Sequence, residues 1–292
     1  MRNLIHNTIS GLSALLHVGK SKVLGMILLL LFNALTISAQ CPAENNAFQD
    51  GEQLDYEMYF NWKFVWVKAG TSRLKTDGIT LPNGTKGYQT SLIATSSRRA
   101  DNFFKMRDTL ISQMTTQMEP LYFRKGAEEG KRYTVDEAWF SYPNGKSHAK
   151  QRRLFRDGSV KTTQDTMDEC IYDMLSILQR ARSFDPKDYK VGDKIHFQMA
   201  TGRKVENQTL IYRGKKNIKA EDGDETTYRC LVLSLVEYDK KGREQEVITF
   251  YVTDDLNHLP VRLDLYLNFG SAKAFIKDIK GNRHPLTSVV KK

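Results

Sequence analysis

The residues of this sequence that could do chemistry are scattered, and they form no recognisable catalytic or metal-binding motif. None of the histidines beyond residue 40 stands at metal-ligand spacing from another histidine, a cysteine or a glutamate. No strained-turn serine motif is present, and the carboxylate pairs Glu128-Glu129 and Asp254-Asp255 lie beside predicted turns. We therefore expect no metal site, no cofactor and no enzymatic activity. The alternative is a catalytic triad assembled in space from distant residues.

A basic stretch is the clearest candidate for binding an anion. Within residues 146–156 the cationic or titratable side chains are Lys146, His148, Lys150, Arg152, Arg153 and Arg156, and the first five form the candidate basic patch. Lys146, His148, Lys150 and Arg152 share one face of a predicted strand, where they could attract phosphate or carboxylate groups. A solvated outer strand that protects a sheet edge from aggregation explains the same residues, and this interpretation is favoured.

Apolar side chains occupy seven consecutive even positions from Leu54 to Trp66, a spacing that lines one face of extended backbone. An unbroken strand of this length would measure roughly 45 Å, so we expect a bend, bulge or tight turn around residues 61–63. The stripe either fills a core or forms the wall of a cavity for a lipid-like ligand. The candidate lining residues are Tyr56, Met58, Phe60, Trp62, Phe64 and Trp66.

The elements that must position these residues are mostly strands, because period-2 alternation recurs between turn signals along the chain. We expect an all-β protein whose strongly curved antiparallel sheet forms an open or nearly closed barrel. The predicted strands are 52–62, 64–76, 87–97, 107–115, 119–127, 132–142, 147–156, 194–200, 205–213, 226–238, 245–253, 259–268 and 271–279.

One segment, residues 168–183, has apolar residues at helical spacing instead. Thr166 and Glu169 fit a capping box before it, and Pro186 follows its end. We expect a single amphipathic helix of about four turns, packed on the concave face of the sheet or across the mouth of the barrel.

The first forty residues have the features of a secretory signal. They contain no acidic residue, and Lys20 and Lys22 precede an apolar run over residues 23–37. The run is short for a membrane-spanning helix, and no later segment qualifies. We therefore expect a signal peptide over 1–40 and one β-barrel-like domain over 41–292, exported to the periplasm or associated with the outer envelope. Lipid anchoring at Cys41 is the less favoured alternative.

The net charge limits the kinds of binding partner, and the cysteine count limits the possible disulfides. The formal charge of +10 falls to +7 when the three basic residues of the signal are removed, which suits an anionic envelope component, whereas export argues against nucleic acid. The cysteines allow one Cys170–Cys230 bridge, and buried unpaired thiols are about as favoured. We expect a monomer.

Several short motifs occur in a fixed order. They are Gly51-Glu52-x-Leu54-x-Tyr56 with Ala69-Gly70, Asp173-Met174-Leu175-Ser176, Tyr189-x-x-Gly192-Asp193, and Thr253-Asp254-Asp255 with Leu259-Pro260-Val261-Arg262. Over roughly residues 48–280 the chain resembles the domain of unknown function 3108 family. The resemblance implies a periplasmic or outer-envelope protein with a curved antiparallel sheet, similar to lipoprotein-carrier and lipocalin-like half-barrels. It brings no known activity and no catalytic residues.

The leading hypothesis from the sequence is a non-enzymatic envelope protein that binds an apolar or amphipathic ligand inside the curved sheet. The alternative is a structural or glycan-facing interaction protein that uses the basic strand.

Overall fold

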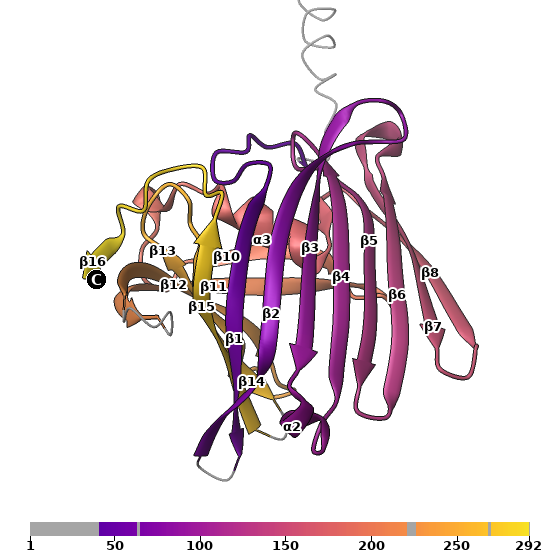
Figure 1. Cartoon of the computed structure of the whole chain (residues 1–292). Helices are drawn as coiled ribbons and strands as arrows, with labels where there is room; N and C mark the ends of the chain where they lie inside the picture. The colour runs from indigo at the N-terminus through magenta and orange to yellow at the C-terminus, as the bar shows by residue number, and fades with distance from the viewer. Residues whose placement is uncertain (1–40, 63–64, 221–225, 268–269, 292) are drawn as a thin grey trace, which may run out of the picture. The chain divides into compact units, whose positions relative to one another are not determined.

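The computed structural model describes residues 41–62, 65–220, 226–267 and 270–291, and one curved sheet dominates them (Figure 1). The strands are β1 (Glu52–Trp62), β2 (Val65–Thr80), β3 (Lys86–Ser96), β4 (Met106–Thr115), β5 (Pro120–Glu129), β6 (Arg132–Ser141), β7 (Ser147–Phe155), β8 (Val160–Met167), β9 (Ile171–Tyr172), β10 (Lys194–Ala200), β11 (Val205–Lys219), β12 (Thr227–Tyr238), β13 (Glu244–Thr253), β14 (Pro260–Leu267), β15 (Gly270–Lys280) and β16 (Val289–Lys291). The signal peptide expected over 1–40 lies outside the described residues.

The strands pair in the order β8-β7-β6-β5-β4-β3-β2-β1-β15-β14-β13-β12-β11-β10-β9, and β16 pairs with β12. Every pairing is antiparallel except that of β9 with β10. The first and last long strands, β1 and β15, therefore meet in the middle of the path. This arrangement confirms the predicted all-β class and the predicted curved antiparallel sheet.

The two ends of the strand path approach each other, so the sheet is nearly closed into a barrel. The Ser147 hydroxyl on β7 accepts a hydrogen bond from the backbone N–H of Ile171 on β9, at 3.1 Å. Farther along β7, the Gln151 Oε1 atom accepts from the backbone N–H of Gly202, at 2.8 Å. Side chains thus close the gap that strand pairing leaves.

The main helix, α3 (Met174–Arg182), is shorter than the helix predicted over 168–183. Its N-cap is Asp173, whose Oδ1 atom accepts from the backbone N–H groups of Leu175 and Ser176, while Ser176 returns a bond to the Asp173 N–H. The capping box predicted at Thr166 and Glu169 is wrong. Thr166 instead belongs to β8, a strand that the sequence analysis did not predict.

In the described part of the chain the other helical elements are one short helix, α2 (Arg98–Asp101), and the 3₁₀ turns η1 (Pro143–Gly145) and η2 (Pro186–Asp188). Among the described residues no helix has the length and apolar character needed to cross a membrane.

Helix α3 packs on the concave side of the sheet, as predicted. Leu175 lies in one apolar core with Leu54, Leu74 and Leu110, and the Ser112 hydroxyl on β4 donates to Asp173 at 2.8 Å. We call this side of the sheet the inner face. Figure 1 shows α3 crossing behind β2–β4 in the upper half of the view, whereas the β1–β2 hairpin points downward. The upper half and lower half of the inner face are named accordingly.

The disulfide joins Cys41 to Cys170, so of the two alternatives that the sequence left open the Cys170–Cys230 bridge is wrong, and the buried unpaired thiol is found at Cys230 alone. Cys230 is a buried free thiol, and burial raises its pKa to about 12. The sequence could not predict the partner of Cys170, because the segment before β1 has no periodic pattern that would place Cys41. Since a lipid anchor is a thioether on the same sulfur, the disulfide and the anchor exclude each other at Cys41.

Candidate functional site

The aromatic stripe begins on the inner face, as predicted, but folds back on itself. Leu54 and Tyr56 are buried in the upper half, and the Tyr56 hydroxyl donates to the Pro260 carbonyl at 2.8 Å. Met58 and Phe60 follow on the same face and are only partly buried. The chain then reverses between β1 and β2, where Trp62 pairs with Val65. The predicted turn near residues 61–63 therefore lies at this reversal.

Trp66 does not share the face of Met58 and Phe60, which corrects the predicted six-residue lining. In the hairpin register Trp66 stands opposite Asn61, whereas Phe60 stands opposite Val67. The parity of the inner face thus changes from even to odd across the reversal, and the alternation of the sequence cannot show this. Trp66 is 38% exposed. Phe64 and the side chain of Trp62 lie outside the described residues.

The lower half of the inner face carries apolar side chains that nothing covers completely. Strand registers place them in two rows, Met58–Ala274–Leu263–Phe250 and Phe60–Ala272–Leu265–Ile248. All eight except Ala274 are partly exposed, whereas Leu54 and Ile276 in the upper half are buried. A row of large aliphatic and aromatic residues with solvent access on a concave face is typical of a binding surface for an apolar group.

Strands β4–β7, which are separated from β1 by β2 and β3, place charged side chains on the same face. We call them the charged cluster, and they are Asp108, Lys125, Glu129, Asp136 and Arg153. The Lys125 Nζ atom lies 3.2 Å from a Glu129 oxygen and 3.8 Å from an Asp108 oxygen. Arg153 and Asp136 form a buried two-pronged ion pair, with Nη2 to Oδ2 at 2.6 Å. The lower half therefore combines an apolar wall with a polar flank.

Asp108 is the least satisfied member of the charged cluster. It is 9% exposed, and within the described residues its buried Oδ1 atom has no hydrogen-bond partner. Burial raises the pKa of this carboxyl to about 6, which the nearby Lys125 ammonium opposes and the Glu129 carboxylate reinforces. A carboxyl held in this state exchanges a proton near neutral pH and is the kind of group that marks functional sites.

The upper half is filled instead. A pocket of about 20 Å³ remains between the end of α3 and strands β10–β13. It is lined by Ala181, Phe184, Pro186, Tyr189, Ile195, Leu210, Tyr212, Leu231, Leu233, Val252 and His258. This volume suffices for about one water molecule and not for an acyl chain.

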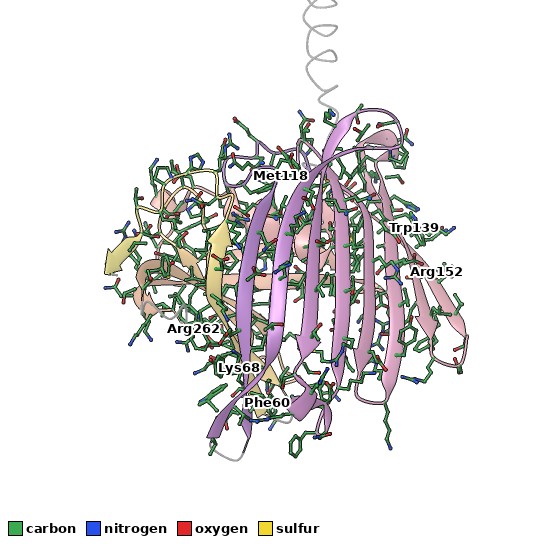
Figure 2. All side chains as sticks on the ribbon, in the orientation of Figure 1. Phe60, Lys68, Met118, Trp139, Arg152 and Arg262 are labelled. Atoms are coloured by element: carbon green, nitrogen blue, oxygen red, sulfur yellow. A yellow bond between two sulfur atoms is a disulfide. The ribbon has the colours of Figure 1, made fainter. Side chains whose placement is uncertain are left out.

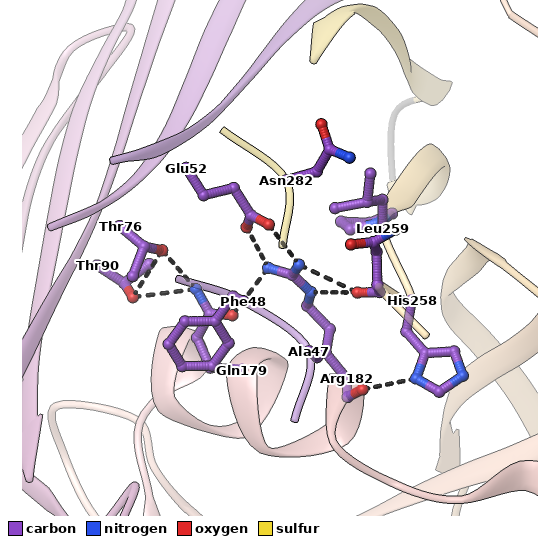
Figure 3. A network of polar contacts seen from close by, with 12 residues as sticks. Ala47, Phe48, Glu52, Thr76, Thr90, Gln179, Arg182, His258, Leu259 and Asn282 are labelled. Atoms are coloured by element: carbon purple, nitrogen blue, oxygen red, sulfur yellow. Dashed lines mark hydrogen bonds and ion pairs between the residues drawn. The ribbon is translucent and has the colours of Figure 1, made fainter. Parts of the chain in front are cut away.

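A buried polar network fixes α3 to the sheet there (Figure 3). Both terminal nitrogens of Arg182 donate to the Glu52 carboxylate, at 2.6 and 2.9 Å, and Nε and Nη2 donate to the Asn257 carbonyl. Gln179 accepts from Arg182 and donates to the hydroxyls of Thr76 and Thr90. Both the Arg182 and the Glu52 side chains are almost completely buried. Every residue of the network has a hydrogen-bonding partner. The network attaches α3 to the sheet, and we call it the pin.

Three of the family-like motifs supply polar residues to this network or to the elements around it. Glu52 comes from the first motif and Asp173 from the helical one, while Asp255 from the late motif accepts from Asn257 and Ser288. The sequence analysis connected these segments only by their order and assigned them no roles. The structure shows that their polar residues hold the helix and the loops around it.

The basic strand is β7, and its side chains divide between the two faces. His148, Lys150 and Arg152 lie on the outer face, where Arg152 stands over the Trp139 ring at 6.0 Å (Figure 2). Arg153 is on the inner face and belongs to the charged cluster, which corrects its place in the predicted basic patch. The edge interpretation is also wrong, because β8 lies outside β7.

Most cations of the basic stretch already have partners. Lys146 pairs with Asp168 at 3.0 Å, Arg152 pairs with Glu137, and the His148 ring nitrogen bonds the Thr166 hydroxyl at 2.7 Å. The ion pairs of Lys146 and Arg152 reduce the positive potential that the sequence predicted for this strand.

Of three solved structures to which this chain is similar, one has a TM-score above 0.5 and supports the fold. A β-barrel-like protein of domain of unknown function DUF1849 from Brucella abortus aligns with a TM-score of 0.53 and 7% identity, over 82% of this chain and 100% of that chain. A Bacteroides fragilis protein described as exported, with a YmcC-like fold, gives 0.33 and 10%, over 82% and 99% of the two chains. A protein from Parabacteroides distasonis described as a lipoprotein gives 0.28 and 11%, over 82% and 100%.

A search among curated proteins finds no match. The model of the protein of unknown function (DUF3108) family matches residues 55–277, so the chain belongs to this family.

Proposed function

We propose that the protein binds an apolar or amphipathic, lipid-like ligand in the lower half of its inner face and does not catalyse a reaction on it. The observation that carries the proposal is the pair of partly exposed apolar rows, on the same face that α3 buries in the upper half. A sheet that simply enclosed a core would bury both halves. Leaving these side chains accessible costs about 25 cal/mol per Å², which a bound acyl chain or ring system would recover.

The charged cluster supports an amphipathic ligand over a purely apolar one. It lies on β4–β7, on the inner face in the lower half, so a ligand across this half would contact both surfaces. The acyl part would cover Met58 and Leu263, and the head group would approach Lys125 and Asp108. Few, fixed polar groups beside an apolar wall are the usual composition of such sites.

The compartment proposed for this function is the cell envelope, after export. The Cys41–Cys170 disulfide supports this proposal, because such bonds persist in oxidising compartments and are rare in the cytosol. The fold is shared with the Brucella protein, but its description assigns no activity that could be transferred.

A binding experiment with two matched variants tests the proposal. Leu263→Gln places an amide on the inner face, whereas Ile93→Gln makes the same kind of change on the outer face, where Ile93 is 49% exposed. Titration with a fluorescent fatty-acid analogue should show saturable binding that Leu263→Gln weakens by about fivefold or more, since about 1 kcal/mol of apolar contact is lost. Ile93→Gln should bind as the parent does.

Either of two results would refute the proposal: no saturable binding by the parent protein, or equal binding by both variants. Urea unfolding of each variant separates lost affinity from lost structure. Native mass spectrometry of the protein purified from its own envelope then identifies any ligand that it carries.

The second candidate is an interaction with an acidic glycan on the outer face of β7. It is favoured by Trp139, which is 39% exposed beside Lys150 and Arg152 and offers a ring for stacking. Salt-sensitive retention on an acidic glycan column, lost in Trp139→Ser, would support it.

A further inference from the structure

Three segments at the lower end of the sheet expose apolar side chains in an unusual concentration. They are the described ends of β1, β2, β14 and β15 and the segment after α2, which lie at the same lower edge in Figure 1. We call their exposed apolar residues the loop edge, and they are Val65, Trp66, Val67, Phe103, Phe104, Tyr266 and Leu267. Phe103 is 76% exposed and Val65 62% exposed, which is rare for side chains of this size.

These segments are neighbours in the structure as well as in the view. In the β1–β15 ladder Phe60 pairs with Ala272, and a Cβ placed on Gly270 would lie 3.0 Å from the Phe60 ring. The α2 segment joins β2 through a hydrogen bond of 2.7 Å from the Ser97 N–H to the Ala69 carbonyl. The loop edge is therefore one surface built from three separate tips.

Cationic side chains accompany the tips. Lys273 lies 4.2 Å from the centre of the Trp66 ring. Lys68, near the start of β2 (Figure 2), is already paired with Glu57 at 2.5 Å and adds less positive potential. Arg98 and Arg99 on α2 are exposed, and no salt bridge in the described part of the chain joins either one to an acid. The acid on the same helix, Asp101, is already paired with Arg107 at 2.6 Å.

We propose that the loop edge docks on the surface of an anionic lipid bilayer. Aromatic rings with a cation alongside suit the boundary between head groups and acyl chains, where tryptophan and tyrosine are enriched. Exposed apolar side chains from three separate segments can enter between head groups, and each nearby unpaired cation contributes about 1 kcal/mol at an anionic surface. A protein partner would instead need a continuous complementary surface of about 800 Å².

This inference stands apart from the ligand site, because the tips would meet a bilayer whether or not the inner face is occupied. If both hold, the open lower half of the inner face lies next to the membrane. A ligand could then pass between bilayer and sheet without crossing much water.

Vesicle flotation tests the docking surface. The purified protein should float with phosphatidylethanolamine vesicles that contain about 30% phosphatidylglycerol, and much less with phosphatidylethanolamine alone or at high salt. The double variant Trp66→Ser/Phe103→Ser should lose about tenfold or more of this binding, because two interfacial side chains are removed. Arg98→Gln/Arg99→Gln should lose several-fold on the anionic vesicles.

The control is Val191→Ser/Leu256→Ser, which removes two apolar side chains from other loops that are 71% and 68% exposed, against 38% for Trp66 and 76% for Phe103. It should float as the parent does. Failure of the parent to float, equal losses in control and test variants, or equal binding to both vesicle types would each overturn the proposal. Fatty-acid titration without vesicles keeps a failure here distinct from a failure of the ligand site.

Discussion

The upper and lower halves of the inner face belong to the same strands, yet side chains are buried in the upper half and partly exposed in the lower half. In the upper half α3 covers the sheet, Leu54 is completely buried and every donor of Arg182 is used. In the lower half Met58, on the same strand and face, keeps solvent access, and Asp108 has an oxygen without a partner. The comparison teaches that packing and hydrogen bonding are complete where the helix lies and incomplete where a ligand would bind.

Breaking the upper pin should have the largest effect. Arg182→Met leaves the Glu52 carboxylate buried without its partner, so the free energy of unfolding should fall by about 3–5 kcal/mol in urea titrations. The control is Arg180→Met, which removes a cation lying 5.2 Å from the Phe184 ring and should cost less than about 1 kcal/mol. Equal losses would show that the pin contributes no special stability.

Opening the disulfide should be nearly as costly, because it closes a loop of 129 residues between the N-terminal segment and the strand that precedes α3. Cys41→Ser/Cys170→Ser should lower the free energy of unfolding by about 2–4 kcal/mol. A reducing agent should lower the melting temperature of the parent and leave that of the double variant unchanged. A parent that melts at the same temperature with and without reductant would contradict the assignment.

A methyl group at Gly202 should weaken the contact between the β10–β11 turn and β7 that helps to close the barrel. Gly202 has φ +80°, and an added Cβ would lie 2.5 Å from the Asp136 carboxyl carbon; Gly192 has φ +98° and nothing within 4 Å. Both substitutions to alanine carry the strain of positive φ, but only Gly202→Ala also clashes. Its additional cost in urea unfolding should be about 1–2 kcal/mol. Equal costs would place the β10–β11 turn away from the ion pair.

Very little of this contrast could be read from the sequence. Alternation predicted the strands and the inner position of Leu54 through Phe60, because side-chain parity is fixed within a strand. It could not place Trp66, since the reversal between β1 and β2 changes the parity, nor Arg153, whose odd position was hidden among even-numbered cations.

No sequence motif marks the charged cluster, because it is assembled by pairing among four strands. The only indication in the sequence is that Lys125 and Asp136 occupy positions whose alternation places them on the inner face. The helix start was misplaced for a related reason: Thr166 and Glu169 satisfy a local capping pattern, but pairing with β7 holds Thr166 in a strand.

The smallest effect should come from Asp108. Its pKa is raised to about 6 in the folded protein, above the 3.8 of an ordinary aspartate, so folding takes up a proton between those values. The contribution of Asp108 to stability should therefore rise by about 1–2 kcal/mol as the pH falls from about 7 to about 4.5, measured as the difference between the parent and Asp108→Asn, because carboxyls with lowered pKa values such as Glu57 act in the opposite direction. Asp108→Asn should flatten this part of the profile and slightly stabilise the protein at pH 7. An unchanged profile would mean that Asp108 titrates normally.

Cysteine accessibility tests the central contrast most directly. Leu54→Cys and Met58→Cys place a thiol on the same strand and the same face, one in the upper half and one in the lower half. The account predicts that maleimide labels Met58→Cys quickly in the folded protein, that a fatty acid slows this labelling, and that Leu54→Cys reacts only on unfolding. Equal, slow labelling at both positions, or fast labelling at Met58→Cys that no fatty acid protects, would contradict an open ligand-binding lower half.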